Sequence, residues 1–301
     1  MSIGAHMSNE NYFISRSHCP VCGSKDVISA YKRPFRSGKI AEYLSWFYGE
    51  GKDFSWIPEN TSFEVLLCDK CELVFQKNVL SEAGTRFFYS SVVNPVHIEV
   101  RDALKDIPDD VRMVFEAAIN EILKYMIQKN NLPITHFNHD ACGRLGLKFL
   151  DYGSGTASWA KMVKDYGVNS FGYDINKKAE EYALKKGIPF LKRQDFSPIF
   201  DFVNLNQVLE HVTDPKAVIR DAKNLLKEEG IVRITVPSGE RILDKLQAEN
   251  WITDPTSSDS LNAIAPLEHI NAFSGKSFLS MLEEFGLNAV EYLPACFVFK
   301  N

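Results

Sequence analysis

Four of the six cysteines fall in two pairs with C-x-x-C spacing. This spacing lets both sulfurs of a pair reach one metal ion, and two such pairs supply the four thiolates of a tetrahedral zinc site. Four thiolates fill the coordination shell, so the predicted role of the zinc is structural. The alternatives are disulfides or buried thiols without a metal. The expected ligands are Cys19, Cys22, Cys68 and Cys71.

A second group of residues forms a glycine turn that begins at Asp151 and contains Gly153 and Gly155. A strand pattern precedes the turn and a helical pattern follows it. Glycines let a ligand approach the backbone closely, and a helix N-terminus offers amides without partners. The sixth position of a dinucleotide fingerprint is Ser158 rather than glycine. Asp174, at the end of the next expected strand, is placed to hold a ribose diol.

Strands and helices alternate from about residue 147 onwards. The expected strands cover 148–151, 170–174, 189–192, 202–206, 231–236, 289–293 and 296–299. The expected helices cover 157–166, 177–186, 215–227 and 277–285. This alternation predicts an α/β domain whose mostly parallel sheet is covered on both faces. An amphipathic helix is expected before it, over 111–127.

Length and composition set limits on the kind of protein. The chain has 301 residues, 45% of them hydrophobic, which suggests about two folded domains and excludes a mainly disordered chain. The apolar runs are far shorter than the roughly 20 residues that span a bilayer. No apolar signal-peptide core is visible, so a cytoplasmic location with reduced thiols is expected. The net charge of −5 argues against general polyanion binding.

These patterns predict four segments. Residues 1–6 are expected to be an expression-tag remnant, 11–77 a zinc-binding module, 78–145 a helical linker or lid, and 146–301 the cofactor-binding domain.

The glycine turn resembles motif I of the class I S-adenosylmethionine-dependent methyltransferases, and 204–212 resembles their fourth strand with the segment after it. The resemblance covers about 147–301. It implies a Rossmann-like, seven-stranded, mostly parallel sheet with a C-terminal antiparallel hairpin, and S-adenosylmethionine as cofactor. Ala157 departs from the pattern, because the family often has a third glycine there. The implied cofactor contacts are Asp151, Gly153, Ser154, Gly155, Asp174, Ile175, Asp195, Phe196, Asn206 and Gln207.

A narrower resemblance rests on the four cysteines and on the adjacent Glu268 and His269. Both features look like the zinc-containing sugar C-methyltransferases that act on nucleotide-linked keto-deoxysugars. That family carries a further C-terminal domain, which this sequence lacks after the expected sheet. The resemblance implies His269 as a candidate base, with Glu268 as a further catalytic candidate. His211 is a catalytic candidate for another reason, since it follows the fourth expected strand at the carboxyl edge of the sheet, where ligands bind. Residues 87–89 resemble the family's aromatic lid, although plain packing is an alternative.

Three functions follow as hypotheses. The first is methylation of a small molecule, such as a sugar, a nucleotide sugar or a natural-product intermediate. The second is an RNA methyltransferase whose zinc module reads RNA, and the third is a catalytically silent methyltransferase fold that acts as a binding subunit. The zinc module could also mediate contacts between two copies of the chain. The local concentration of cations near the cysteine pairs is Lys32, Arg33, Arg36 and Lys39.

Overall fold

The computed structural model describes residues 11–93, 146–252, 257, 259–293 and 296–300, together with Ala117, Asn120 and Lys124. These three single residues are helical, and the rest of the helix expected over 111–127 lies outside the described residues. The chain divides into two compact units that are not continuous in sequence. Unit 1 comprises 1–97, 210–213 and 237–280, and unit 2 comprises 98–209, 214–236 and 281–301. No helix in the described part of the chain is long and apolar enough to cross a membrane.

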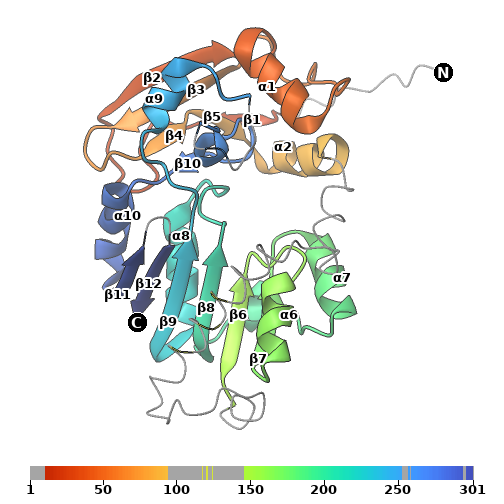
Figure 1. Ribbon diagram of the computed structural model, residues 1–301, viewed down its shortest axis with the longest axis vertical. Coiled ribbons are helices and arrows are strands. Elements are labelled where there is room, and N and C mark those ends of the chain that lie inside the picture. The colour runs from red at the N-terminus through yellow and green to blue at the C-terminus, as the bar shows by residue number, and fades with distance from the viewer. Residues whose placement is uncertain are drawn as a thin grey trace, which may run out of the picture. The chain divides into compact units, whose positions relative to one another are not determined.

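Unit 2 is built on a six-stranded sheet in the order β11-β12-β9-β8-β6-β7 (Figure 1). β7, β6, β8 and β9 run parallel, and β12 and β11 form an antiparallel hairpin beside β9. The strands are β6 (Lys148–Tyr152), β7 (Asn169–Tyr173), β8 (Phe200–Asn206), β9 (Leu226–Thr235), β11 (Asn288–Leu293) and β12 (Cys296–Lys300). The α/β methyltransferase-type sheet with its C-terminal hairpin is therefore confirmed.

One expected strand of this sheet does not form. Residues 189–192 make only an isolated parallel bridge, between Phe190 and Gly172. The Gly172 amide donates to the Pro189 carbonyl at 2.9 Å, and the Leu191 amide donates to the Gly172 carbonyl at 2.8 Å. The extended run stops there, because the 3-10 turn Arg193–Asp195 begins almost at once. The described sheet therefore has six strands and a bridge at its edge, where the sequence predicts seven strands.

The helices of unit 2 begin where the sequence provides caps. α8 (Pro215–Leu225) has Pro215 in its first turn, and the Asp214 carboxylate accepts from the Ala217 amide at 3.0 Å. α7 (Lys177–Lys185) is capped by the Asn176 side chain. α6 (Ser158–Asp165) instead begins after Ala157, which is left-handed at φ 58°. Glycine adopts this conformation without strain, so the missing third glycine has a structural consequence.

Unit 1 contains two antiparallel sheets, one in the order β10-β4-β3-β2 and one that pairs β1 with β5. Its strands are β1 (Phe13–Ser15), β2 (Val27–Pro34), β3 (Ser62–Cys68), β4 (Val74–Gln76), β5 (Asn78–Leu80) and β10 (Asn271–Ala272). Its helical elements are α1 (Gly38–Tyr48), α2 (Glu82–Phe87), the π-helix η1 (Phe88–Val92), α9 (Ile242–Ala248) and the 3-10 turn η4 (Asn262–Ile264). α10 (Gly275–Leu282) spans the boundary between the units, and the 3-10 turn η5 (Glu283–Phe285) follows it.

The aromatic-rich segment between the cysteine pairs forms much of the core of unit 1. Phe35 and Phe63 are fully buried, and Tyr43 is nearly so. Trp251, from the later segment of the chain, packs edge-on against both Tyr31 and Tyr43. Trp46 is the exception, since 40% of it remains exposed.

Candidate functional site

The four cysteines of the two pairs come together in unit 1, and each carries a free thiol. The sulfurs of Cys19 and Cys71 lie 3.5 Å apart, as do those of Cys22 and Cys68. All four sulfurs lie within 4.8 Å of one another. Zinc–sulfur bonds of about 2.3 Å in a tetrahedron separate the sulfurs by about 3.8 Å, so this donor set fits zinc.

The two cysteine pairs use the same backbone turn. In the first, the Gly23 amide donates to the Cys19 carbonyl, and in the second the Glu72 amide donates to the Cys68 carbonyl, both at 2.9 Å. Gly23 has φ 72° and Glu72 has φ 62°. The sequence explains the first turn through its glycine, whereas the second forms with a glutamate in the left-handed region. The hydrogen bond from Cys71 lowers the pKa of Cys19 to about 5, which favours the thiolate form.

The glycine turn of unit 2 lies beside the acidic residue of the next strand. The Gly155 amide donates to Asp174 Oδ2 at 2.9 Å, and the Asn176 amide donates to Oδ1 at 2.8 Å. A Cβ at Gly153 would lie 2.6 Å from Val208 Cγ2, whereas a Cβ at Gly155 would meet no atom within 4 Å. The turn therefore packs tightly at Gly153 and is open at Gly155. Burial raises the pKa of Asp174, and backbone hydrogen bonds to its carboxylate oppose this effect.

A buried polar row crosses three strands of the sheet in unit 2. Asp151, Asn204 and Arg233 stand in register on β6, β8 and β9. Asn204 Nδ2 donates to Asp151 Oδ1 at 3.1 Å, and Arg233 Nη1 donates to Asn204 Oδ1 at 3.1 Å. The Arg233 guanidinium lies 5.3 Å from the centre of the Trp159 ring. Burial raises the pKa of Asp151 to about 7, and the Asn204 hydrogen bond opposes the shift.

Three further predicted cofactor contacts of unit 2 lie after β7 or in and after the 3-10 turn Arg193–Asp195. Ile175, next to Asp174, is 84% exposed. Phe196 packs edge-on against Tyr173 at 4.9 Å. Asp195 is exposed, and it accepts from the Lys192 amide at 3.0 Å.

Three more of these residues lie after β6, at the end of β8 or directly after β8. Ser154 is buried, and its hydroxyl has no hydrogen-bond partner within the described residues. Asn206 Oδ1 accepts from the Thr235 hydroxyl at 2.8 Å. Gln207 has φ 57°, and its amide donates to the Thr235 carbonyl at 3.0 Å.

The predicted catalytic residues come together within unit 1. The rings of His211 and His269 are edge-on, with centres 4.4 Å apart. His211 Nδ1 lies 3.2 Å from the Glu268 carbonyl, and His269 Nδ1 faces the Asn262 carbonyl. Because a carbonyl only accepts hydrogen bonds, both contacts assign the proton to Nδ1. In each neutral imidazole Nε2 is therefore the nitrogen that carries the lone pair.

Two residues of this cluster have roles that the sequence analysis missed. Glu210 is fully buried, and neither carboxylate oxygen has a hydrogen-bond partner among the described residues. Burial raises its pKa to about 8. The hydroxyl of Tyr48, at the end of α1, donates to Glu268 Oε2 at 2.7 Å. Glu210 could have been suspected because it adjoins His211, but no sequence signal links Tyr48 to Glu268.

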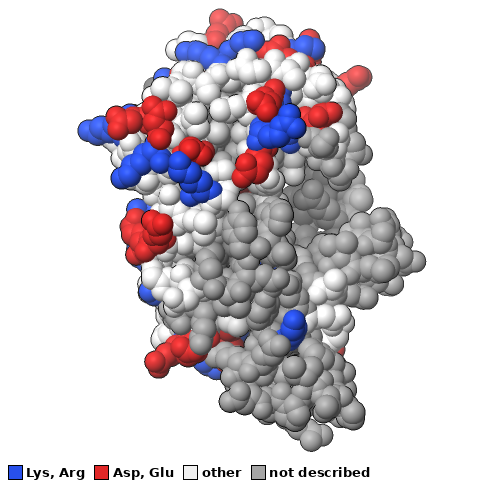
Figure 2. All heavy atoms as spheres, turned by 60° about the vertical axis from the view of Figure 1, so that its left-hand side comes forward, with Lys and Arg blue, Asp and Glu red and all other residues white. Residues whose placement is uncertain are grey.

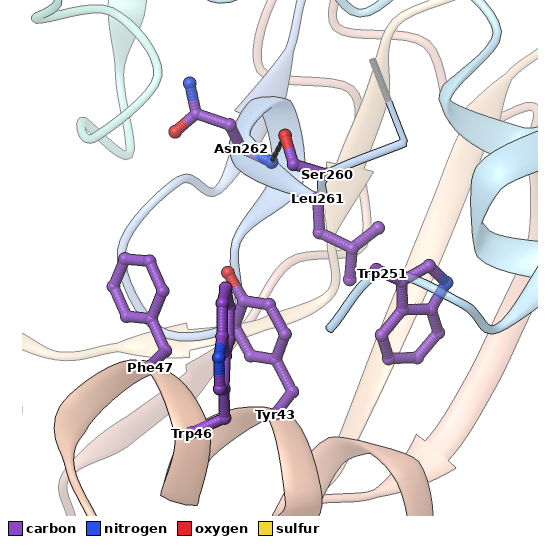
Figure 3. Close-up of a pocket in the computed structure, with 7 residues that line it drawn as sticks. All are labelled: Tyr43, Trp46, Phe47, Trp251, Ser260, Leu261 and Asn262. Atoms are coloured by element: carbon purple, nitrogen blue, oxygen red, sulfur yellow. Dashed lines mark hydrogen bonds between the residues drawn. The ribbon is translucent and has the colours of Figure 1, made fainter. Parts of the chain in front are cut away.

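A pocket in unit 1 adjoins the histidine cluster through Asn262, whose carbonyl faces His269. Its empty space of about 190 Å³ includes open solvent and encloses no room for a water molecule, and aromatic rings form most of its wall (Figure 3). The lining residues are Tyr43, Trp46, Phe47, Trp251, Ser260, Leu261 and Asn262.

The aromatic residues expected to form a lid also lie in unit 1. Phe88 is fully buried and packs edge-on against Tyr48, and Phe87 stacks on Tyr12. Tyr89 lies in the π-helix and contacts Phe88. These contacts account for packing, and the lid role stays a prediction.

A family model described as a methyltransferase domain matches residues 112–292. This is more than half of the chain, and the chain therefore belongs to the methyltransferase-domain family. The predicted class, a class I S-adenosylmethionine-dependent methyltransferase, is confirmed at that level. The match alone says nothing about the acceptor.

Individual relatives match only part of this chain, at about 30% identity. An uncharacterized protein of Methanocaldococcus jannaschii is 29% identical over 153 residues, which are 49% of this chain and 68% of that protein. A ubiquinone biosynthesis O-methyltransferase of Proteus mirabilis is 30% identical over 115 residues, which are 34% of this chain and 47% of that protein. The chain thus spans about half the length of the curated ubiquinone O-methyltransferases that it matches.

Solved structures resemble the chain at low identity. The magnesium protoporphyrin IX methyltransferase of Synechocystis, with bound S-adenosylhomocysteine, has 15% identity and a TM-score of 0.48. The similarity covers 73% of this chain and 98% of that one. The 1,6-didemethyltoxoflavin-N1-methyltransferase of Burkholderia thailandensis has 13% identity and a TM-score of 0.38, over 64% and 86% of the two chains.

Proposed function

We propose that this protein transfers a methyl group from S-adenosylmethionine to a small molecule, with the cofactor held in unit 2 and the acceptor activated at the histidine cluster. The observation that carries the proposal is the hydrogen bond from the Gly155 amide to Asp174. It joins the glycine turn and the acidic residue into one site at the carboxyl edge of the parallel strands, where ligands of such sheets bind. The open side of Gly155 and the exposed Ile175 suit the same ligand.

S-adenosylmethionine supplies a methyl group that its sulfonium already activates. The bond from the acceptor to the methyl carbon forms as the carbon–sulfur bond breaks, and the electron pair of that bond stays on sulfur. An acceptor that is a hydroxyl or a carbon acid must also lose a proton. We assign its removal to His211 and His269, whose Nδ1 atoms face backbone carbonyls, and binding of an acceptor hydroxyl to Glu268.

A small-molecule acceptor fits unit 1 better than RNA does. Each cation of the basic group near the cysteines is paired with a carboxylate, in the pairs Lys32–Glu64, Arg33–Glu249, Arg36–Glu59 and Lys39–Glu42. A cation that is paired with a carboxylate is less available to neutralise a phosphate, and phosphate contacts supply much of the affinity for nucleic acid. Figure 2 shows positive and negative side chains intermingled on one face of the described residues.

The cysteine cluster is proposed to hold one structural zinc ion through Cys19, Cys22, Cys68 and Cys71. The resemblance of this cluster and of the Glu268–His269 pair to sugar C-methyltransferases supports a sugar, a nucleotide sugar or a related natural-product intermediate as the acceptor class.

The proposal is tested with wild-type protein and the His269→Ala and Asp174→Ala variants. Calorimetry measures S-adenosylmethionine binding, and methyl transfer to small molecules of a cell extract is followed with labelled cofactor. The proposal expects His269→Ala to bind the cofactor normally and transfer poorly, and Asp174→Ala to lose binding. Normal transfer by His269→Ala, or normal binding by Asp174→Ala, would contradict it.

A further inference from the structure

Glu210 carries a carboxylate whose burial needs an explanation. The side chain has no exposed surface, and neither oxygen accepts a hydrogen bond from the described residues. Burying a carboxylate is costly unless a proton or a cation balances its charge. Both oxygens remain available to a cation.

Two imidazoles lie beside this carboxylate. Ligand atoms of Glu210, His211 and His269 all lie within 4.8 Å of one another. Each histidine uses Nδ1 to face a backbone carbonyl, which makes Nε2 the ligating atom. Histidines that bind metals are oriented in this way, by a second acceptor behind the ring.

Backbone hydrogen bonds join the two segments that carry these side chains. The Glu210 carbonyl accepts from the amides of Ile270 and Asn271, at 2.7 and 3.2 Å. The Asn271 side chain donates to the Val212 carbonyl at 2.7 Å. This fixed frame holds the three side chains together before any ligand arrives.

We propose that Glu210, His211 and His269 bind one divalent first-row transition-metal ion. Two imidazoles and one carboxylate are a common ligand set for such ions, and three protein ligands leave positions for the acceptor. This inference rests on the proposed function and narrows it to acceptors that bind the ion through a hydroxyl or enol oxygen. A bound cation lowers the pKa of such a hydroxyl, so the oxygen gives its proton to water before it takes the methyl group from the sulfonium. In this form of the site the two histidines act as metal ligands and not as bases.

The test uses Co²⁺ as the probe, added to full-length protein that already holds one equivalent of zinc. We expect one further Co²⁺ ion per chain, with the weak absorption of nitrogen and oxygen ligands. Loss of a partner behind a metal ligand costs about 10–100-fold in affinity, so loss of a ligand in Glu210→Gln or His269→Ala should cost about 100-fold or more. Glu181→Gln, which changes an exposed carboxylate of α7, is the matched control and should bind Co²⁺ normally.

Each of three results of the Co²⁺ titration would overturn the inference: absorption only from cobalt–thiolate bonds, no Co²⁺ beyond the cysteine site, or binding that Glu210→Gln leaves unchanged. Methyl transfer by protein without the second ion would also overturn it, while leaving the proposed function intact. Absent S-adenosylmethionine binding with normal Co²⁺ binding would instead contradict the proposed function.

Discussion

The Tyr48 hydroxyl donates a 2.7 Å hydrogen bond to Glu268 Oε2, although the two residues are 220 positions apart in the chain. Tyr48 is buried, and burial is the main cause that raises its pKa well above the usual value, with the nearby Glu268 charge adding to the effect. The phenol therefore stays protonated and acts as a donor. This bond holds the carboxylate of the predicted Glu268–His269 pair in one orientation.

Tyr48→Phe should destabilise the protein by about 1–3 kcal/mol, because the carboxylate loses a donor in a buried setting. Methyl transfer should also fall while cofactor binding is unchanged. The control is Tyr43→Phe, since the Tyr43 hydroxyl has no hydrogen bond within the described residues. Denaturant unfolding and labelled transfer measure both effects, and equal behaviour of the two variants would contradict the role of this bond.

The two glycines of the turn should respond differently to alanine. At Gly153 the strain of φ 77° adds to a contact of 2.6 Å with Val208, so Gly153→Ala should cost about 2–5 kcal/mol. At Gly155 only the strain of φ 49° applies, so Gly155→Ala should cost about 1–2 kcal/mol. Gly155→Ala should nevertheless bind S-adenosylmethionine poorly. Thermal unfolding and calorimetry check this pair, and normal cofactor binding by Gly155→Ala would place the cofactor elsewhere.

Asp151 should make the stability of the protein depend on pH. Burial raises its pKa to about 7, whereas the pKa in the unfolded chain is about 3.9. Between these values the folded protein holds a proton that the unfolded chain releases, so this contribution to stability falls as pH rises. The loss is at most about 4 kcal/mol, and it is complete above pH 7.

Asp151→Asn removes the titrating group and keeps an oxygen that accepts from Asn204. The nearby charges, Asp174 and Arg233, stay in place. The free energy of unfolding, measured across about pH 5 to 8, should therefore fall more steeply for the wild type than for the variant. Parallel curves would show that Asp151 does not titrate in this range.

The sequence predicted much of this structure because the relevant signals are local. A parallel βαβ unit brings the glycine turn around Gly153 next to the acidic residue that follows the second strand. Both segments lie close together in the sequence, so the sequence alone predicts this arrangement. The cysteine pairs likewise specify their own turns. By contrast, the contact between Tyr48 and Glu268 depends on tertiary packing, for which the sequence carries no period or motif.

The prediction of a strand over 189–192 was wrong. Its apolar pattern suits a strand, but the turn at Arg193–Asp195 leaves room only for a bridge at Phe190. Glu210 was also undervalued, because burial without a partner is visible only in three dimensions.

Removal of one cysteine ligand should abolish zinc binding at the cluster. We expect Cys68→Ser to hold one zinc ion fewer per chain than the wild type and to unfold at a lower temperature, because the ion joins two distant turns. Cys142→Ser, which changes a cysteine that belongs to neither C-x-x-C pair, is the control. Elemental analysis and thermal unfolding measure these two quantities. Unchanged zinc content in Cys68→Ser would show that the cluster does not bind zinc.

The central claim is methyl transfer to a small molecule, and methyl-labelled S-adenosylmethionine tests it most directly. The protein is mixed with labelled cofactor and an extract of the cells that produce it, and the products are separated into acid-soluble molecules and precipitable polymer. The account predicts label in the acid-soluble fraction, at a rate that falls sharply with His269→Ala. Label in polymer that ribonuclease releases would contradict the account and make RNA the acceptor.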